Sequence, residues 1–292
     1  MSVLRYPGAK TKAIPILDPW VPLENGTDRL IVSPFVGGAS FELFLANHRQ
    51  RRILAFDWYE PLINFWQTLK YQRHKLCNHL REVHETFQKL QPEEQRLQFY
   101  DWRDRLNDDE QEQKHSNSDS SDLDDPIARA ATFYAVNRCS FSGTGCSGGF
   151  SADAASKCFS SNALDRLEDL SLDRIDFGHQ HFADTIVQYP DALLFLDPPY
   201  YLTNCHNNLY GSRGNMHRSF DHITLYQLLC THPRWILCYN NCDEIRQLYG
   251  GFPQIPTSWK YSMSTTKNKK RPDGQELVVV SPWVYEERNS SA

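Results

Sequence analysis

The sequence lacks any long hydrophobic run and any apolar leader. None of its 292 residues belongs to an uninterrupted apolar stretch of about 18 residues, the length that a membrane-spanning helix needs. The first residues, Met1–Tyr6, also lack the apolar core of a secretion signal. We therefore expect a protein that neither spans a membrane nor is secreted.

The eight cysteines lack a regular spacing, and no two of them form a Cys-x-x-Cys pair. A disulfide framework or a structural zinc site would need such regularity. We expect reduced and mostly buried thiols, and we expect no metal ion.

An excess of positive charge is also lacking, because the net charge is −5. The negative charge is concentrated, however: nine acids and three bases lie between Arg103 and Asp125, so this tract carries −6 and the rest of the chain carries +1. We interpret 104–125 as an acidic loop. A basic cluster follows near the C-terminus, made of Lys267, Lys269, Lys270 and Arg271. The cluster favours contact with phosphates, and a solvated loop tip explains it equally well.

Hydrophobic residues make up 40% of the chain, enough for a substantial core. Short apolar runs separated by helical patterns predict an α/β fold with a mostly parallel sheet covered on both faces. The predicted strands are 30–32, 53–56, 175–182, 193–196, 235–239 and 276–280. Between the second and third, apolar residues recur at helical spacing, which predicts a mainly helical insert over 71–165.

The central strand Leu193–Leu196 runs directly into Asp197-Pro198-Pro199-Tyr200. Ligand sites of open α/β sheets lie at the carboxyl ends of strands, and two prolines make this end rigid. A carboxylate, a carbonyl and an aromatic face together suit a planar amine such as adenine. An ordinary strand-ending turn accounts for these four residues equally well.

A second ligand pattern lies near the N-terminus. A strand at 30–32, a small-residue turn at Gly37-Gly38-Ala39 and a helix at 41–46 form a layout that lets the backbone approach a nucleotide closely. Asp57 ends the next strand, 20 residues after Gly37. That spacing predicts an acid that accepts the hydroxyl groups of a ribose.

Taken together, these motifs resemble the N6-adenine DNA methyltransferases of the alpha class, the Dam-like or D12 class family. Tyr6-Pro7-Gly8-Ala9-Lys10 is similar to the lysine motif of that family, Phe35–Ser40 to its cofactor loop, Asp57 to its ribose-binding acid and Asp197–Tyr200 to its catalytic motif. The motifs occur in the order of the family, and weaker similarities extend over nearly the whole chain.

The resemblance implies a Rossmann-like sheet of the S-adenosylmethionine-dependent methyltransferases, carrying an inserted target-recognition domain. The catalytic domain would comprise 1–70 and 166–292, and the insert 71–165. The implied enzyme transfers a methyl group from S-adenosylmethionine to N6 of an adenine flipped out of duplex DNA at a specific site. Its partners would be double-stranded DNA and a cognate restriction endonuclease, in the cytoplasm of a prokaryote or from a phage.

The resemblance also implies roles for individual residues. The catalytic residues are Asp197, Pro198, Pro199 and Tyr200. The residues next to the cofactor are Tyr6, Lys10, Phe35, Gly37, Gly38, Ser40, Asp57, Phe182, Asp184 and Asp197. The residues that contact DNA are Arg138, Phe141 and Ser142, together with the basic cluster Lys267, Lys269, Lys270 and Arg271.

The chain departs from the family pattern at its cofactor loop. Ser33 stands where an acid is usual, and Gly38-Ala39 reverses the usual order of small residues. These departures keep open a non-catalytic or weakly catalytic DNA-binding relative. Methylation of cytosine at N4, which needs the same kind of amine receptor, and methylation of RNA are further alternatives.

Overall fold

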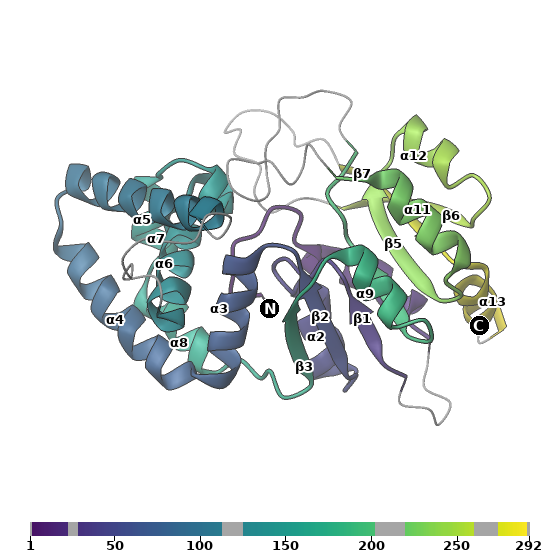
Figure 1. The fold of residues 1–292 in the computed structure, drawn as a ribbon, viewed down its shortest axis with the longest axis horizontal. Coiled ribbons are helices and arrows are strands. Elements are labelled where there is room, and N and C mark those ends of the chain that lie inside the picture. The colour runs from purple at the N-terminus through teal and green to yellow at the C-terminus, as the bar shows by residue number, and fades with distance from the viewer. Residues whose placement is uncertain (1, 23–28, 113–124, 202–219, 260–273, 291–292) are drawn as a thin grey trace.

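The computed structural model describes residues 2–22, 29–112, 125–201, 220–259 and 274–290. Within these residues one seven-stranded sheet forms the centre of the molecule, with the order β3-β2-β1-β4-β5-β7-β6 (Figure 1). The strands are β1 (Ile31–Ser33), β2 (Ile53–Asp57), β3 (Ile175–His179), β4 (Leu193–Leu196), β5 (Trp235–Asn240), β6 (Gln254–Trp259) and β7 (Gly274–Val280). No helix in the described parts of the chain is long and apolar enough to cross a membrane.

The first five strands of this order pair in parallel, which confirms the predicted mostly parallel sheet. β7 pairs antiparallel with both β5 and β6. The sequence did not predict β6, whose Pro256 weakens a strand pattern and is tolerated because β6 is an edge strand. Parallel pairing places the carboxyl ends of β1, β2 and β4 at the same edge of the sheet.

The helices surround this sheet and also form a separate helical part. Those close to the sheet are α1 (Ile14–Leu17), α2 (Ser40–His48), α3 (Glu60–Tyr71), α9 (Phe182–Gln188), α11 (His222–Thr231), α12 (Asp243–Leu248) and α13 (Pro282–Ser290). Those of the helical part are α4 (Arg73–Lys89), α5 (Pro92–Glu112), α6 (Pro126–Cys139), α7 (Ala152–Cys158) and α8 (Ser161–Glu168). Short 3₁₀ turns are η1 (Lys10–Lys12), η2 (Asp18–Trp20), η3 (Phe141–Gly143) and η4 (Gly145–Ser147).

Both faces of the sheet are buried, and the strand residues alternate between two cores. On β4, Leu193 and Phe195 pack in the core that holds α2 and α3, whereas Leu194 and Leu196 pack with α9, α11 and α12. This arrangement explains why the run Leu193–Leu196 is wholly apolar.

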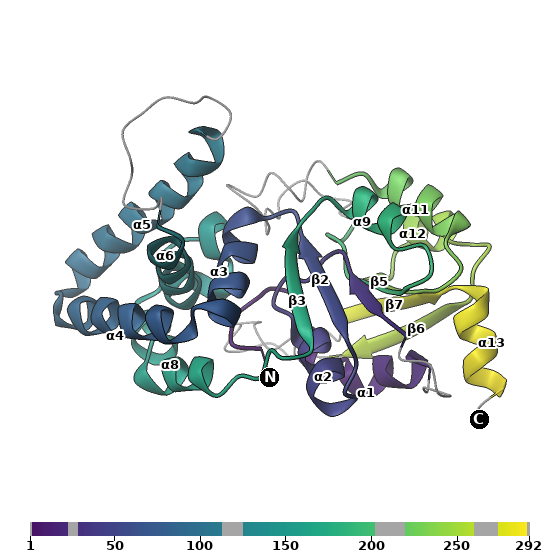
Figure 2. The same cartoon turned by 60° about the horizontal axis from the view of Figure 1, so that its bottom comes forward.

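The helical part lies beside the β3 edge of the sheet, and α13 lies at the opposite end of the molecule (Figures 1 and 2). Its central helix α6 packs on α3, where the rings of Phe65 and Tyr134 stack with centroids 5.5 Å apart. The apolar core of α4, α5, α6 and α8 is continuous with that of α2 and α3. The helical part is therefore anchored to the sheet by a shared core.

One predicted strand was too long. The strand predicted over 175–182 ends at His179, and Phe182 begins α9. Cys242, which precedes α12, makes no side-chain cap, and Asn241 accepts a hydrogen bond from Arg246. Asp221 caps α11 by accepting hydrogen bonds from Ile223 and Thr224.

Candidate active site

A cavity of about 310 Å³ opens at the carboxyl ends of β1, β2 and β4. Its walls come from six separate stretches of sequence: the N-terminal loop, the turn after β1 with the start of α2, the end of β2, the start of α9, the end of β4 with the turn that follows, and the segment before α11. The lining includes most of the residues that the sequence assigned to a cofactor, namely Tyr6, Lys10, Phe35, Gly37, Gly38, Ser40, Asp57, Phe182 and Asp197.

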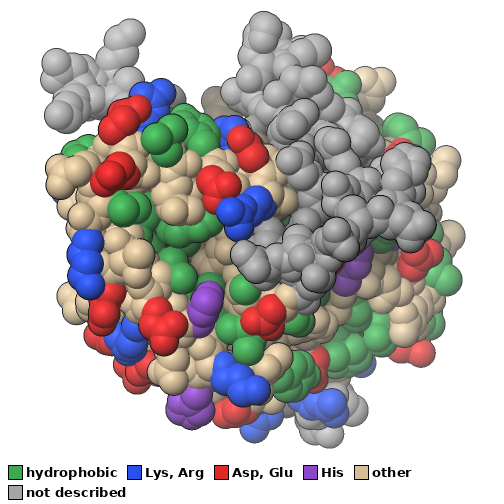
Figure 3. All heavy atoms as spheres, turned by 60° about the vertical axis from the view of Figure 1, so that its left-hand side comes forward, with side chains coloured by type: hydrophobic (Ala, Val, Ile, Leu, Met, Phe, Trp, Pro, Cys, Tyr) green, Lys and Arg blue, Asp and Glu red, His purple; other side chains and the backbone are tan. Residues whose placement is uncertain are grey.

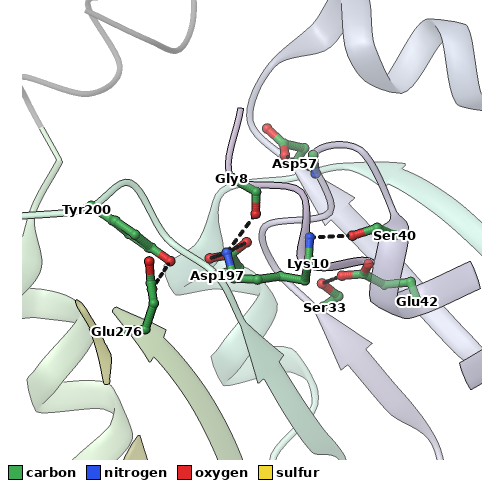
Figure 4. A network of polar contacts seen from close by, with 10 residues as sticks. Gly8, Lys10, Ser33, Ser40, Glu42, Asp57, Asp197, Tyr200 and Glu276 are labelled. Carbon is green, nitrogen blue, oxygen red and sulfur yellow. Dashed lines mark hydrogen bonds and ion pairs between the residues drawn. The ribbon is translucent and has the colours of Figure 1, made fainter. Parts of the chain in front are cut away.

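An ion pair between two lining residues, Lys10 and Asp197, belongs to a network of polar contacts (Figure 4). The Lys10 ammonium is 2.6 Å from both carboxylate oxygens of Asp197 and donates a third hydrogen bond to the carbonyl of Gly8, at 2.9 Å. The backbone N–H of Lys10 donates to Ser40 Oγ at 2.7 Å. The lysine is thus fixed at both its backbone and its side chain.

The electrostatics of this pair follow from its burial. Burial by itself lowers the pKa of Lys10, but the charge and hydrogen bonds of Asp197, together with Cys238 and Glu276, outweigh this effect and the pKa is raised. Burial raises the pKa of Asp197, and the Lys10 ammonium opposes that rise. The lysine stays charged, and its charge holds the Asp197 carboxylate in one orientation.

The Tyr200 side chain is held by a second buried carboxyl. Its hydroxyl donates to Glu276 Oε2 on β7 at 2.7 Å, and Glu276 is only 1% exposed. Burial raises the pKa of Glu276 to about 7, against the lowering effect of Lys10 and of the Tyr200 hydrogen bond. The Lys10 ammonium lies 5.2 Å from the centroid of the Tyr200 ring. The ring is thereby fixed next to Asp197.

The turn after β1 is built for close approach. Gly37 has a φ of +45°, and a Cβ added there would lie 2.8 Å from Cε1 of Tyr6. A Cβ at Gly38 would lie 2.8 Å from the Cβ of Tyr6. Ala39 has a φ of 53°, a conformation that glycine adopts more easily. The reversed Gly38-Ala39 order therefore places a strained alanine in the position that favours glycine.

Asp57 faces the same turn from the end of β2. Its Oδ2 accepts the N–H of Gly37 at 3.0 Å, and its Oδ1 accepts the N–H of Tyr59 at 3.1 Å. Burial raises its pKa to about 6, while these amide bonds lower it. Each oxygen retains a second lone pair for a ligand hydroxyl.

Aromatic rings form the outer wall of the cavity. Phe35, Phe182 and Phe220 contact one another, with centroids 5.2–5.6 Å apart. Trp58 is 54% exposed at the rim and contacts the rings of His179 and His181. Such a wall suits the planar base of a nucleoside.

Some of the predicted residues lie elsewhere. Pro199 lines the cavity, whereas Pro198, Tyr200 and Asp184 are not among its lining residues. Asp184 lies in the first turn of α9. The basic cluster Lys267, Lys269, Lys270 and Arg271 lies outside the described residues, as does 113–124 of the acidic tract.

The predicted DNA-contact residues follow α6 and differ in exposure. Phe141 is 56% exposed, and Ser142 follows it with a φ of 52°. Arg138 is only 8% exposed, and its guanidinium donates to the carbonyls of Cys158 and Val3 at 2.7 and 3.2 Å. This placement gives Arg138 an internal structural role and argues against the predicted contact with DNA.

Sequence reasoning missed several residues at or near the cavity, among them Glu42, Glu276 and Trp58. Glu42 lies in α2 and Glu276 in β7. Both elements face the core, and a single acid within such an element does not by itself indicate a functional site. Trp58 could have been found, because it directly follows Asp57.

The cavity fits S-adenosylmethionine in the chemistry of its lining. Gly37 and Gly38 have no side chain, so the turn packs closely against Tyr6 and lines the cavity with its backbone, and the aromatic wall and Asp57 suit an adenosine. Several carboxyl groups face a cavity that would receive a positively charged sulfonium. Fold and site together define a methyltransferase that depends on S-adenosylmethionine.

The comparisons with known proteins identify its kind. Residues 6–263 match the family described as D12 class N6 adenine-specific DNA methyltransferase. Over 295 aligned residues the chain is 23% identical to the type II methyltransferase M.MjaIII of Methanocaldococcus jannaschii, covering 95% of this chain and 98% of that protein. The chain belongs to the D12 class N6 adenine-specific DNA methyltransferases. It is an enzyme that methylates adenine in DNA, with S-adenosylmethionine as methyl donor.

Proposed function

We propose that the turn after β4 is the catalytic centre, with Asp197 and the carbonyl of Pro198 accepting the two N–H groups of the target amine. The observation that carries the proposal is the Lys10–Asp197 ion pair in the lining of the cavity. The Asp197 carboxylate accepts two hydrogen bonds from a lysine that is itself fixed by Gly8, so it is preorganised and little reorganisation is needed when the amine arrives.

The residues act on the nucleophile. The lone pair of the exocyclic amine of adenine is delocalised into the ring, and two acceptors at its N–H groups localise that lone pair on nitrogen. Tyr200, fixed by Glu276, stacks on the base and sets its plane. S-adenosylmethionine supplies an already activated methyl group when bound. The chain therefore contributes positioning and electrostatics more than proton transfer.

We assign the rest of the cavity to the cofactor. Asp57 accepts the ribose hydroxyls with its remaining lone pairs, and Gly37 and Gly38 allow the backbone to approach. Phe35 and Phe182 hold the adenine ring of the cofactor. Asp184 has less support, because it lies outside the cavity lining.

We assign DNA recognition to 71–165, which divides the chain into catalytic parts 1–70 and 166–292 and an inserted recognition part. Exposed Phe141 supports this assignment, since an aromatic side chain can fill the gap that a flipped base leaves. The described surface in Figure 3 has acidic and basic side chains interspersed. Contacts with phosphate are therefore expected elsewhere, and the basic cluster at 267–271 is still the prediction for them.

The name of the relative supports a physiological proposal. A type II methyltransferase acts beside a restriction endonuclease of the same specificity. We propose that this chain modifies one short DNA sequence in a prokaryotic or phage-infected cell and protects it from such a partner.

The direct experiment compares wild type with Asp197→Asn, using transfer of labelled methyl from S-adenosylmethionine to unmethylated duplex DNA. Asparagine keeps the volume but removes the charge, and we expect the transfer rate to fall by about 10³-fold or more. Asp176→Asn is the matched control, because Asp176 lies on β3, pairs with Lys70 of α3 and does not line the cavity, so transfer should be unchanged. Transfer that persists in Asp197→Asn would contradict the assigned mechanism.

Digestion of the product and mass spectrometry separate N6-methyladenine from N4-methylcytosine, and an RNA competitor tests the RNA alternative.

A further inference from the structure

A buried glutamate without a catalytic role lines the same cavity. Glu42 lies in the first turn of α2 and is 3% exposed. The Ser33 hydroxyl, at the end of β1, donates to its Oε1 at 2.6 Å (Figure 4). Burying a carboxylate costs several kcal/mol unless it is paired, and one neutral hydroxyl compensates only in part. Glu42 is therefore a candidate for a binding role.

The other carboxyl groups among the described lining residues already have strong partners. Asp57 accepts two backbone amides, Asp197 pairs with Lys10, and Asp221 caps α11. Glu42 accepts a hydrogen bond from the neutral Ser33 hydroxyl and one from its own backbone N–H. Because Lys10 neutralises Asp197, Glu42 is the buried carboxylate among the described lining residues that is left to neutralise a positively charged ligand.

S-adenosylmethionine carries two positive charges, the sulfonium and the α-ammonium of its methionine part. A sulfonium has no N–H to donate, whereas an ammonium forms directional, charge-assisted hydrogen bonds with a carboxylate. We propose that Glu42 binds the α-ammonium of the cofactor and that Ser33 orients its carboxylate. The proposal rests on the cavity being the cofactor site.

This inference accounts for the departure at Ser33. An acid is usual at that position in the similar family, and here the strand end carries a hydroxyl. The Ser33 hydroxyl donates a hydrogen bond to the Glu42 carboxylate on α2. The acid that the family usually has at the end of β1 is therefore replaced by an acid from α2.

The protonation of Glu42 supports the same role. Burial raises its pKa to about 7, opposed by the Ser33 hydrogen bond and by Lys10, and Asp197 adds to the rise. Cys238 on β5 also faces it. A bound ammonium would lower this pKa, so binding near neutral pH should release protons from Glu42.

Calorimetry with two ligands tests the proposal. The ligands are S-adenosylhomocysteine and its deaminated analogue, in which hydrogen replaces the amino group and the carboxylate is kept. For Glu42→Gln, we expect binding of S-adenosylhomocysteine to weaken by about 10- to 100-fold and binding of the deaminated analogue to change by less than about 2-fold. Wild type should also release protons at pH 7, seen as an enthalpy that depends on the buffer, and Glu42→Gln should lose this release.

Two further variants keep the test decisive. Ser33→Ala retains the Glu42 carboxylate but removes the hydroxyl that orients it. We expect its affinity for S-adenosylhomocysteine to fall by about 3- to 10-fold and its affinity for the deaminated analogue to stay unchanged. This variant replaces Glu42→Gln in the test if Glu42→Gln does not fold. Glu276→Gln removes another buried carboxyl near Lys10 that does not line the cavity, so it should leave the ratio of the two affinities unchanged. Equal weakening of both ligands, or no weakening, would overturn the role of Glu42. Absence of binding to wild type would instead overturn the cofactor cavity itself.

Discussion

At the scale of single residues, the site depends on partners that are distant in sequence. Lys10 and Asp197 are separated by 187 residues and meet in a buried ion pair. Removing one partner of such a pair costs about 3–5 kcal/mol, because the other charge stays buried and unpaired. Truncation of Asp197 to alanine would therefore lower stability as well as activity, which is why asparagine is the more informative replacement.

Sequence patterns predicted the site residues that lie at the ends of strands and missed the site residues that lie within core-facing helices and strands. Asp57 and Asp197 follow short apolar runs, so their location could be read from the chain. The pairing of Lys10 with Asp197 could be expected only through the family resemblance, because a loop lysine carries no signal of its destination. Glu42 and Glu276 were missed because periodicity assigns their positions to the core.

Gly37→Ala tests the close approach of the turn after β1. The new Cβ would need a φ near +45° and would overlap the ring of Tyr6. We expect the free energy of unfolding to fall by about 2–4 kcal/mol and cofactor affinity to fall with it. Gly251→Ala is the matched control, because a Cβ there meets no atom within 4 Å. Urea denaturation and calorimetry measure both effects, and equal results for the two variants would refute the explanation.

At the scale of elements, the N-terminal segment joins the cavity to the loop after α6. Asn137 donates to the carbonyl of Arg5 and accepts its N–H, at 2.7 and 2.9 Å, and the Arg5 guanidinium donates to the carbonyl of Ser140 at 2.9 Å. Five residues later the same segment delivers Lys10 to Asp197. The loop that carries Phe141 is thus held in a fixed relation to the catalytic centre.

Phe141→Ala tests the proposed contact of this loop with DNA. Phe141 is exposed, so we expect the free energy of unfolding to change by no more than about 0.5 kcal/mol. Methyl transfer at limiting DNA should fall by about 10-fold, and a mismatch opposite the target adenine should restore most of it, since an unpaired base is easier to flip. Leu97→Ala on α5 is a control of similar exposure and should leave transfer unchanged. Failure of the mismatch to rescue would argue against a gap-filling role.

Element boundaries were predicted less well than element types. The helical insert was predicted because apolar residues recur at helical spacing, and three of them on α4, Leu76, Leu80 and Phe87, are buried. The third strand was drawn too long because Phe182 looks like a strand residue locally. It lies in α9 because its ring packs with Phe35 and Phe220, a contact between distant segments.

At the scale of the whole molecule, a parallel sheet buried on both faces explains the apolar strands and was predictable from them. The position of the helical part was not predictable, because it depends on ring packing between α3 and α6. The strand order at the β5-β7-β6 end also follows from pairing between distant segments.

Buried carboxyls should make stability depend on pH. The pKa of Glu276 rises from 4.5 to about 7 on folding, so the folded state binds the proton more tightly than the unfolded state. Its contribution to stability is therefore lost as pH rises through this window. Relative to Glu276→Gln, wild type should lose about 2–3 kcal/mol of unfolding free energy between pH 5 and about 8. Urea denaturation of both proteins across this pH range measures the difference between their unfolding free energies. A difference that does not change with pH, or wild type gaining stability relative to Glu276→Gln as the pH rises, would contradict the burial effect. His84 and His232, whose pKa values burial lowers, act in the opposite sense and cancel in the comparison.

The central claim is that a site built around Asp197 methylates adenine at N6 in a specific DNA sequence. Single-molecule sequencing of DNA from a methylation-free host that expresses the chain tests this claim most directly. We predict N6-methyladenine at one short sequence with wild type and unmodified DNA with Asp197→Asn. Unmodified DNA with wild type, N4-methylcytosine in place of N6-methyladenine, or equal modification by both proteins would contradict it.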